Sequence, residues 1–89
     1  NKAIITVVGK DTVGIIARLC SYLAENNVNI LDISQTIVQE YFNMMMIVDM
    51  ANIQKPFEQI VNELIETGNK IGVQVKCQRE EIFNKMHRI

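Results

Sequence analysis

Apolar and polar positions follow a changing period along the chain, and each period predicts a different element. Residues 3–9 form a β-branched run, which is typical of a strand and ends at a glycine. Across residues 13–26 the apolar positions recur at helical spacing instead. The expected buried face of this helix consists of Ile16, Leu19, Cys20 and Leu23. Asp11 or Thr12 is expected to cap its start, and Asn26-Asn27 to mark its end.

Two strands are expected to follow as a hairpin. Alternation of apolar and polar residues across positions 31–37 predicts a half-buried strand, and Gln39-Glu40 can form the turn. The next strand has a strongly apolar face that consists of Phe42, Met44, Met46, Val48 and Met50. Its opposite side still carries Met45 and Ile47, so we expect both sides of this strand to be at least partly covered.

A second helix and a fourth strand complete the pattern. Pro56 suits the first turn of the helix, and Gly68 is expected to end it. The apolar stripe of this helix consists of Phe57, Ile60, Val61, Leu64 and Ile65. Residues 70–78 then alternate, with Ile71, Val73, Val75 and Cys77 facing inward. The order β-α-β-β-α-β predicts an α+β, ferredoxin-like domain, in which two helices cover one face of a four-stranded antiparallel sheet.

The last ten residues, 80–89, predict a C-terminal helix. Acidic residues open this segment and basic residues close it, as the helix dipole favours. Its apolar face consists of Ile82, Phe83, Met86 and Ile89. The helix either covers the exposed sheet face of its own domain or packs on a partner subunit, and the sequence leaves both arrangements open.

Composition narrows the possible functions. A length of 89 residues fits one domain, and a net charge of -1 gives no electrostatic reason to expect binding to nucleic acid or to an acidic membrane. No apolar segment is long enough to span a membrane, and the first apolar run is too short for a secretion signal, so we expect a cytoplasmic protein. Cys20 and Cys77 form no CxxC pair, and His87 is the only histidine. We therefore expect two small buried thiols and no metal or cofactor.

The stretch VVGKDTVGII, residues 7–16, joins the first strand to the first helix and is the best candidate for a binding site. Gly9 and Gly14 have the spacing of a Walker A loop, but Ile15-Ile16 stand where that loop needs Lys and Ser or Thr. No nucleophile has a positioned base, so no enzymatic activity is expected. The third strand lacks the basic residues of an RNA-binding RRM domain.

A free amino acid fits this stretch better. N–H groups at the start of the helix suit a carboxylate, and Asp11 can pair with an ammonium group. The alternative is that Asp11 only caps the helix and that Gly9 only forms a turn.

The segment TVVGKDTVGIIARLCSYLAENNVNILDISQ resembles the opening half of an ACT domain. The matching signature is a strand, Gly-x-Asp-x-x-Gly-Ile, a helix, and then Val-Asn-Ile-x-Asp-Ile-x-Gln. The resemblance covers essentially the whole chain, and the tail is similar to that of the small stand-alone bacterial and archaeal ACT proteins. Related paired domains occur in the transcriptional regulator of the glycine cleavage system. The resemblance implies an ACT domain over residues 1–79, with residues 80–89 as a helical extension of the same domain.

Members of this family are regulatory modules that usually dimerise and most often bind amino acids, where the first strand-to-helix loop meets the second strand. Carried over to this chain, the ligand-binding positions are Gly9, Lys10, Asp11, Gly14, Asn29 and Ile30. Asp11 would bind the ammonium group, and Asn29 the other polar groups of the ligand. One departure is that Thr12-Val13 replace the Arg-Pro of many ligand-binding members, which removes a positive charge and a preset φ.

The hypothesis from sequence is a homodimeric, non-catalytic protein that senses an amino acid or a similar small metabolite. The alternative is a docking module for protein–protein interaction whose ligand pocket is vestigial.

Overall fold

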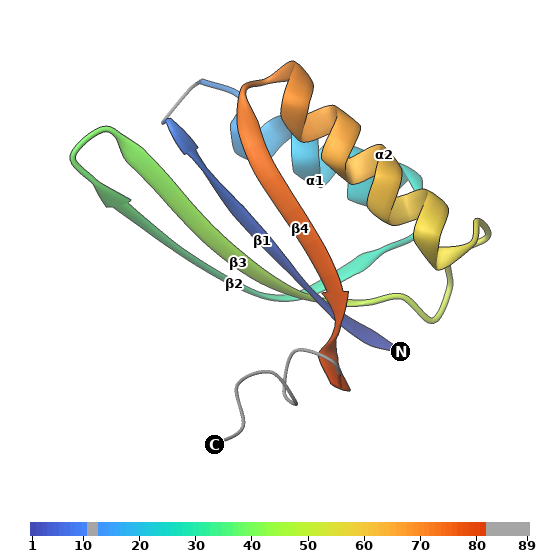
Figure 1. Cartoon of the computed structure of the whole chain (residues 1–89). Coiled ribbons are helices and arrows are strands. Elements are labelled where there is room, and N and C mark those ends of the chain that lie inside the picture. The colour runs from blue at the N-terminus through green and yellow to red at the C-terminus, as the bar shows by residue number, and fades with distance from the viewer. Residues whose placement is uncertain (11–12, 82–89) are drawn as a thin grey trace.

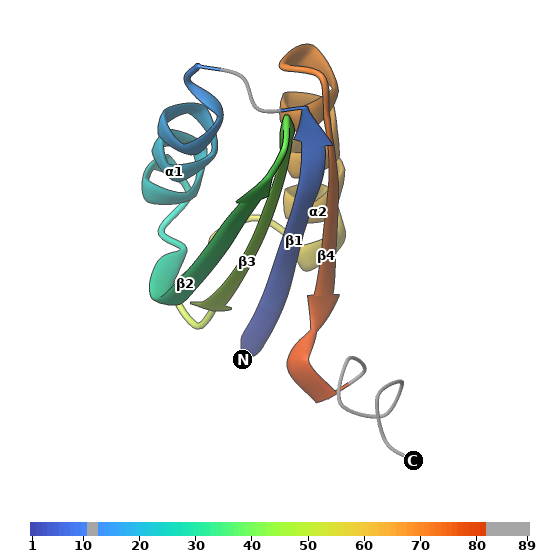
Figure 2. The same cartoon turned by 90° about the vertical axis from the view of Figure 1, so that its left-hand side faces the viewer.

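The chain folds into a four-stranded antiparallel sheet with both helices on one face (Figures 1 and 2). The computed structural model describes residues 1–10 and 13–81. Its elements are β1 (Lys2–Lys10), α1 (Ile15–Glu25), β2 (Asn29–Val38), β3 (Tyr41–Asp49), α2 (Phe57–Lys70) and β4 (Val73–Arg79). The strands lie in the order β2-β3-β1-β4. The predicted ferredoxin-like architecture is therefore confirmed.

The hydrophobic core lies between the sheet and the two helices. The predicted face of β3 is buried throughout, and Met46 and Val48 have no exposed surface. The other strands and the helices add Ala3, Ile5, Val7, Val73, Val75, Cys77, Leu19, Leu23, Ile60 and Leu64. Removal of this apolar surface from water is the main force that holds the helices on the sheet.

Helix α1 buries a different face from the one predicted. Ile15 is buried together with Leu19 and Leu23, whereas Ile16 is 38% exposed and Cys20 is partly exposed. The sequence offers two adjacent isoleucines, and packing against the sheet and α2 selects Ile15 for the core. The helix begins after Gly14 and ends at Asn26, and Asn27 has a φ of 61°, so the predicted exit is confirmed. The predicted caps Asp11 and Thr12 lie outside the described residues.

Strand β2 is not half-buried as predicted but exposed along almost its whole length. The pairing of Ile33 with Met46 and of Ile37 with Phe42 places both isoleucines on the helix-facing side of the sheet. They are nevertheless 41% and 54% exposed. Because β2 is an edge strand, the two helices do not extend far enough to cover it. The predicted turn at Gln39-Glu40 is confirmed, and Gln39 has a φ of 58°.

Gly68 does not end helix α2, which continues to Lys70. A Cβ atom at Gly68 would lie 2.4 Å from Cγ2 of Val75, so the missing side chain lets α2 lie directly against β4. The glycine with a positive φ is Gly72, after the helix. Ile71 forms the C-cap of α2, so the inward alternation of β4 begins at Val73.

The predicted C-terminal helix falls mostly beyond the described residues. Glu80 and Glu81 have helical backbone directly after β4, and residues 82–89 lie outside the described part of the chain.

Candidate functional site

The first group of predicted site residues lies where β1 ends and α1 begins. Gly9 and Lys10 are the last two residues of β1 and pair with Phe42 and Tyr41 of β3. Gly9 also faces β4, where a Cβ atom would lie 2.7 Å from Cγ1 of Val73. A side chain at this position would collide with β4, so the packing of the sheet by itself requires a glycine here.

Gly14 is the N-cap of helix α1. Its φ of 91° lies in the left-handed region, which favours glycine, and its carbonyl accepts the first helical bond from the Arg18 N–H at 3.0 Å. An added Cβ would meet no atom within 4 Å, so the space beside Gly14 is open. The first turn carries no acidic side chain. No first-turn carboxylate neutralises the positive end of the helix dipole, an arrangement that favours a bound anion.

The second group of predicted site residues lies at the start of β2. Asn29 is exposed and pairs with Asp49, and Ile30 is partly buried and pairs with Val48. A β-bulge follows between Ile30 and Asp32, where the register shifts by one residue. Bulges of this kind twist an edge strand and turn its side chains toward a new direction.

The two groups lie at opposite ends of the sheet. Along β3, the partner of Gly9 is residue 42 and the partner of Asn29 is residue 49. A separation of seven residues along a strand corresponds to about 23 Å. Figure 2 shows the end of β1 at one end of the sheet and the start of β2 at the other. One copy of the described chain therefore does not bring the predicted site residues together, and Asp11 lies outside the described residues.

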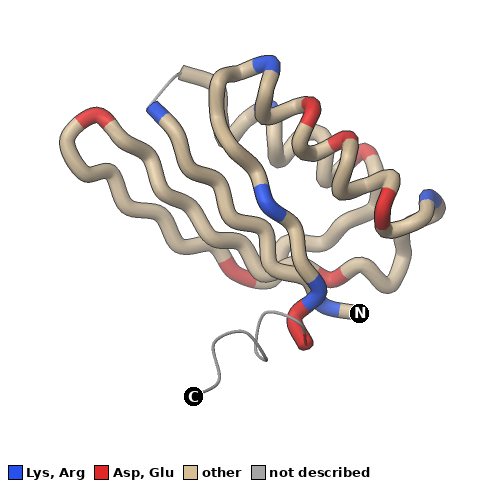
Figure 3. Tube along the Cα trace, viewed as in Figure 1, with Lys and Arg blue, Asp and Glu red and all other residues tan. Residues whose placement is uncertain are grey.

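Between the two groups runs the free edge of β2. No charged residue occurs from Ile33 to Val38 of β2, and Figure 3 shows most of this strand in the tan of uncharged residues. Edge strands that stay exposed in a monomer usually carry charged residues or prolines, which prevent pairing with another chain. The exposed Ile33 and Ile37 add an apolar surface beside that edge. The alternating pattern predicts a half-buried strand and does not identify these two residues as surface features, although the outer position of the second strand in a ferredoxin-like sheet indicates their exposure.

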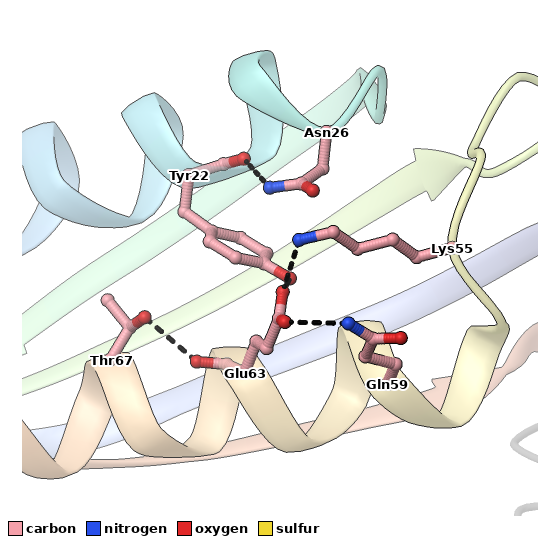
Figure 4. A network of polar contacts seen from close by, with 6 residues as sticks. All are labelled: Tyr22, Asn26, Lys55, Gln59, Glu63 and Thr67. Atoms are coloured by element: carbon pink, nitrogen blue, oxygen red, sulfur yellow. Dashed lines mark hydrogen bonds and ion pairs between the residues drawn. The ribbon is translucent and has the colours of Figure 1, made fainter.

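A network of polar contacts connects α1 and α2 where the two helices face each other (Figure 4). The Tyr22 hydroxyl donates to Oε1 of Glu63 at 2.6 Å, and Lys55 Nζ and Gln59 Nε2 donate to the same carboxylate at 3.0 Å each. Hydrogen bonds from Tyr22, Gln59 and Lys55 lower the pKa of Glu63 to about 2. Burial and the hydrogen bond to Glu63 raise the pKa of Tyr22. A permanently ionised carboxylate and a neutral phenol fit a structural link between the helices rather than proton transfer.

Neither cysteine pairs with the other, and no metal-binding cluster occurs among the described residues. Cys77 is buried in the core, and this burial raises the pKa of its thiol to about 11. No group of three His, Cys, Asp or Glu side chains within residues 1–10 and 13–81 could hold a metal ion. None of the helices in this part of the chain has the length and apolar character needed to cross a membrane.

Sequence and structure together define the class of protein. The sequence model of the ACT domain matches residues 1–78, so the chain belongs to the ACT domain family. It is 68% identical to a UPF0237 protein of Bifidobacterium longum, over 100% of this chain and 99% of that protein. This relative places the chain among the UPF0237 proteins of the ACT family.

Solved structures agree with this assignment. An ACT domain protein from Streptococcus pneumoniae superposes with a TM-score of 0.81 at 44% identity, covering 92% of each chain. A putative glycine cleavage system transcriptional repressor has a TM-score of 0.71 at 20% identity, covering 86% of this chain and 44% of that one. The second similarity concerns the fold alone. The expected membership of the ACT family is confirmed.

Proposed function

We propose that the protein is a non-catalytic regulatory module that binds a small metabolite, and specifically an amino acid, at the interface of a homodimer. The observation that carries this proposal is the separation of the two groups of candidate residues, together with the free, uncharged edge of β2 between them. A site built from both groups needs a second copy of the chain.

Antiparallel pairing of β2 with its copy supplies that arrangement. A twofold axis near the middle of β2 would place the start of one β2 strand beside the end of the other. Asn29 of one copy would then approach the end of the sheet that carries Gly9, Lys10 and Gly14 of its partner. Ile33 and Ile37 of both copies would lose their exposed surface in the same contact.

The chemistry of the two groups fits an amino acid. The start of α1 offers N–H groups to a carboxylate beside the open space at Gly14. Asp11 offers a negative charge to the ammonium group, and the Asn29 side chain offers both a donor and an acceptor. Ile30, partly buried, would contact the side chain of the ligand. The two free thiols fit a cytoplasmic protein, because that compartment is reducing.

The first test is thermal unfolding in the presence of each common amino acid at millimolar concentration. A ligand at about a hundred times its Kd adds about 2.7 kcal/mol to the native state, and each kcal/mol raises the Tm of so small a domain by about 4–8 °C. We expect one or two amino acids to raise the Tm. The Asp11→Ala and Asn29→Ala variants should both lose this response, whereas the exposed-site controls Glu66→Ala and Asn62→Ala should keep it.

Mixing the two inactive variants tests the shared site directly. In a heterodimer of Asp11→Ala with Asn29→Ala, one site carries both substitutions and the other carries neither. The mixture should therefore recover ligand binding that neither variant has alone. No recovery in a mixture shown to exchange subunits would mean that each site belongs to one chain. A flat amino-acid panel would instead favour the docking module.

A further inference from the structure

The face of the sheet opposite the helices carries an apolar strip along β1 and β3. Ile4 pairs with Ile47 and Thr6 with Met45, so these side chains share the face that the helices leave open. On this face Val8 is 45% exposed and Met45 is 39% exposed, whereas Ile47 is partly buried and Ile4 is only 6% exposed. We call Ile4, Val8, Met45 and Ile47 the outer strip. Its exposed members, Val8 and Met45, leave apolar surface that a covering segment would remove from water.

The outer strip borders a shallow hollow. This hollow has a volume of about 260 Å³, and its lining includes Thr6, Val8, Ser34, Thr36, Asn43 and Met45. Most of the lining side chains are short, so the surface is recessed over β3, which lies between β1 and β2. Its polar groups are hydroxyls and an amide, without a charge that would repel an apolar helix. The hollow therefore fits an amphipathic segment better than a charged ligand.

The chain leaves the sheet at one end of this strip. Arg79, the last residue of β4, pairs with Ala3, beside Ile4. Glu80 and Glu81 are already helical. The eight residues 82–89, which lie outside the described part, have their apolar side chains at Ile82, Phe83, Met86 and Ile89, the spacing of one helix face.

The length of this segment matches the length of the strip. Eight helical residues extend about 12 Å. The four-residue step from Ile4 to Val8 along β1 is about 13 Å. A helix that starts beside Ile4 therefore reaches Val8 without a linker.

We propose that residues 82–89 form a short helix on the outer strip of their own chain. The attachment at Arg79 holds the segment at an effective concentration in the millimolar range, which a second copy at micromolar concentration does not match. The segment therefore covers the face opposite the helices and leaves the β2 edge as the main surface for self-association. This inference is independent of ligand binding and holds whether or not an amino acid binds.

The test is nuclear magnetic resonance on the full chain. We expect nuclear Overhauser effects between the Phe83 ring and the methyl groups of Ile4 and Ile47, and between Ile89 and the methyl groups of Val8. A mixture of isotope-labelled and unlabelled protein separates contacts within a chain from contacts between chains, and we expect only the former. Contacts found only between chains would assign the segment to the partner subunit. Their complete absence would overturn the proposal.

Substitutions on the two sides of the segment give a second measurement. The double variant Phe83→Asp/Met86→Asp should shift the Ile47 and Met45 methyl resonances and raise the fluorescence of an added apolar dye several-fold. The matched variant Asn84→Asp/His87→Asp adds the same number of carboxylates on the other side and should change neither. Equal effects of the two variants, or no effect of the first, would contradict the proposed contact.

Discussion

The hydroxyl of Tyr22 lies 2.6 Å from Oε1 of Glu63 and joins helix α1 to helix α2, which are 41 residues apart in sequence at this contact. Both helices also pack on the sheet, but their direct contact with each other is small compared with the sheet pairing. The polar bridge therefore adds to the core packing of Leu19 and Leu23 that positions α1. Helix α1 thus carries both Tyr22 and, at its N-cap, Gly14 of the proposed binding site.

Replacing Tyr22 by Phe should destabilise the domain while keeping the ring in place. The variant loses one hydrogen bond to a charged acceptor, and we expect the Tm to fall by about 4–8 °C. Thermal unfolding at neutral pH measures the change. Replacing exposed Tyr41 by Phe removes a hydroxyl from the surface and serves as the control, with little change expected.

The same contact should make stability depend on pH at both extremes. The folded-state pKa of Glu63 is lowered from 4.5 to about 2, so its contribution is present above pH 4.5 and is lost as the pH falls toward 2. The pKa of Tyr22 is raised above 10.0, so its contribution is present below pH 10 and is lost as the pH rises further. Urea unfolding of the wild type and of Glu63→Gln should differ most near neutral pH and converge near pH 2. Curves that stay parallel from pH 7 to pH 2 would contradict the assigned pKa of Glu63.

An alanine at Gly68 should destabilise the domain, although alanine favours helices. Its Cβ would lie 2.4 Å from Cγ2 of Val75 and 3.0 Å from the carbonyl oxygen of Val73, so α2 and β4 would have to separate. Overpacking of this kind costs about 1–3 kcal/mol. Urea unfolding measures the loss, and Asn69→Ala, on the exposed side of the same helix, is the control. A Gly68→Ala variant as stable as the wild type would mean that the helix shifts without cost.

A charge on the β2 edge should prevent the proposed dimer. Ile37→Lys places a charge on an exposed side chain, so the folded monomer should tolerate it, while two copies would bring two such charges close together. Sedimentation at micromolar concentration should show a dimer for the wild type and a monomer for this variant. Gln74→Lys on β4, the other edge strand, should leave the dimer intact. A wild type that is monomeric under these conditions would remove the basis for a shared site.

The two thiols should differ in reactivity. Cys20 is partly exposed on α1, whereas Cys77 is buried and its pKa is raised to about 11. At pH 8 an aromatic disulfide reagent should label Cys20 much faster than Cys77, since the thiolate is the reactive form. The single variants Cys20→Ser and Cys77→Ser identify which thiol reacts. Equal rates in the native protein would contradict the burial of Cys77.

The sequence alone determined the architecture and the buried faces of β3 and β4. The more strongly apolar face of β3 and the alternation of β4 from Val73 indicated which side chains point to the core, because successive side chains of a strand point to opposite faces. The helix exit at Asn26-Asn27 followed from residues that accept left-handed backbone. These features depend on interactions between residues that are close together in the chain, so the sequence is sufficient to predict them.

Tertiary structure decided the rest. Adjacent isoleucines at 15 and 16 satisfy the same helical period, and only packing against the sheet and α2 placed Ile15 inside. Gly68 carries the signal of a helix end, but the approach of β4 gave it a different role. The alternation of β2 is as regular as that of a half-buried strand, yet its edge position leaves Ile33 and Ile37 in solvent. The sequence motif likewise does not predict that Gly9 and Asn29 lie at opposite ends of the sheet. Strand order and direction are set by contacts between residues that are far apart in the chain.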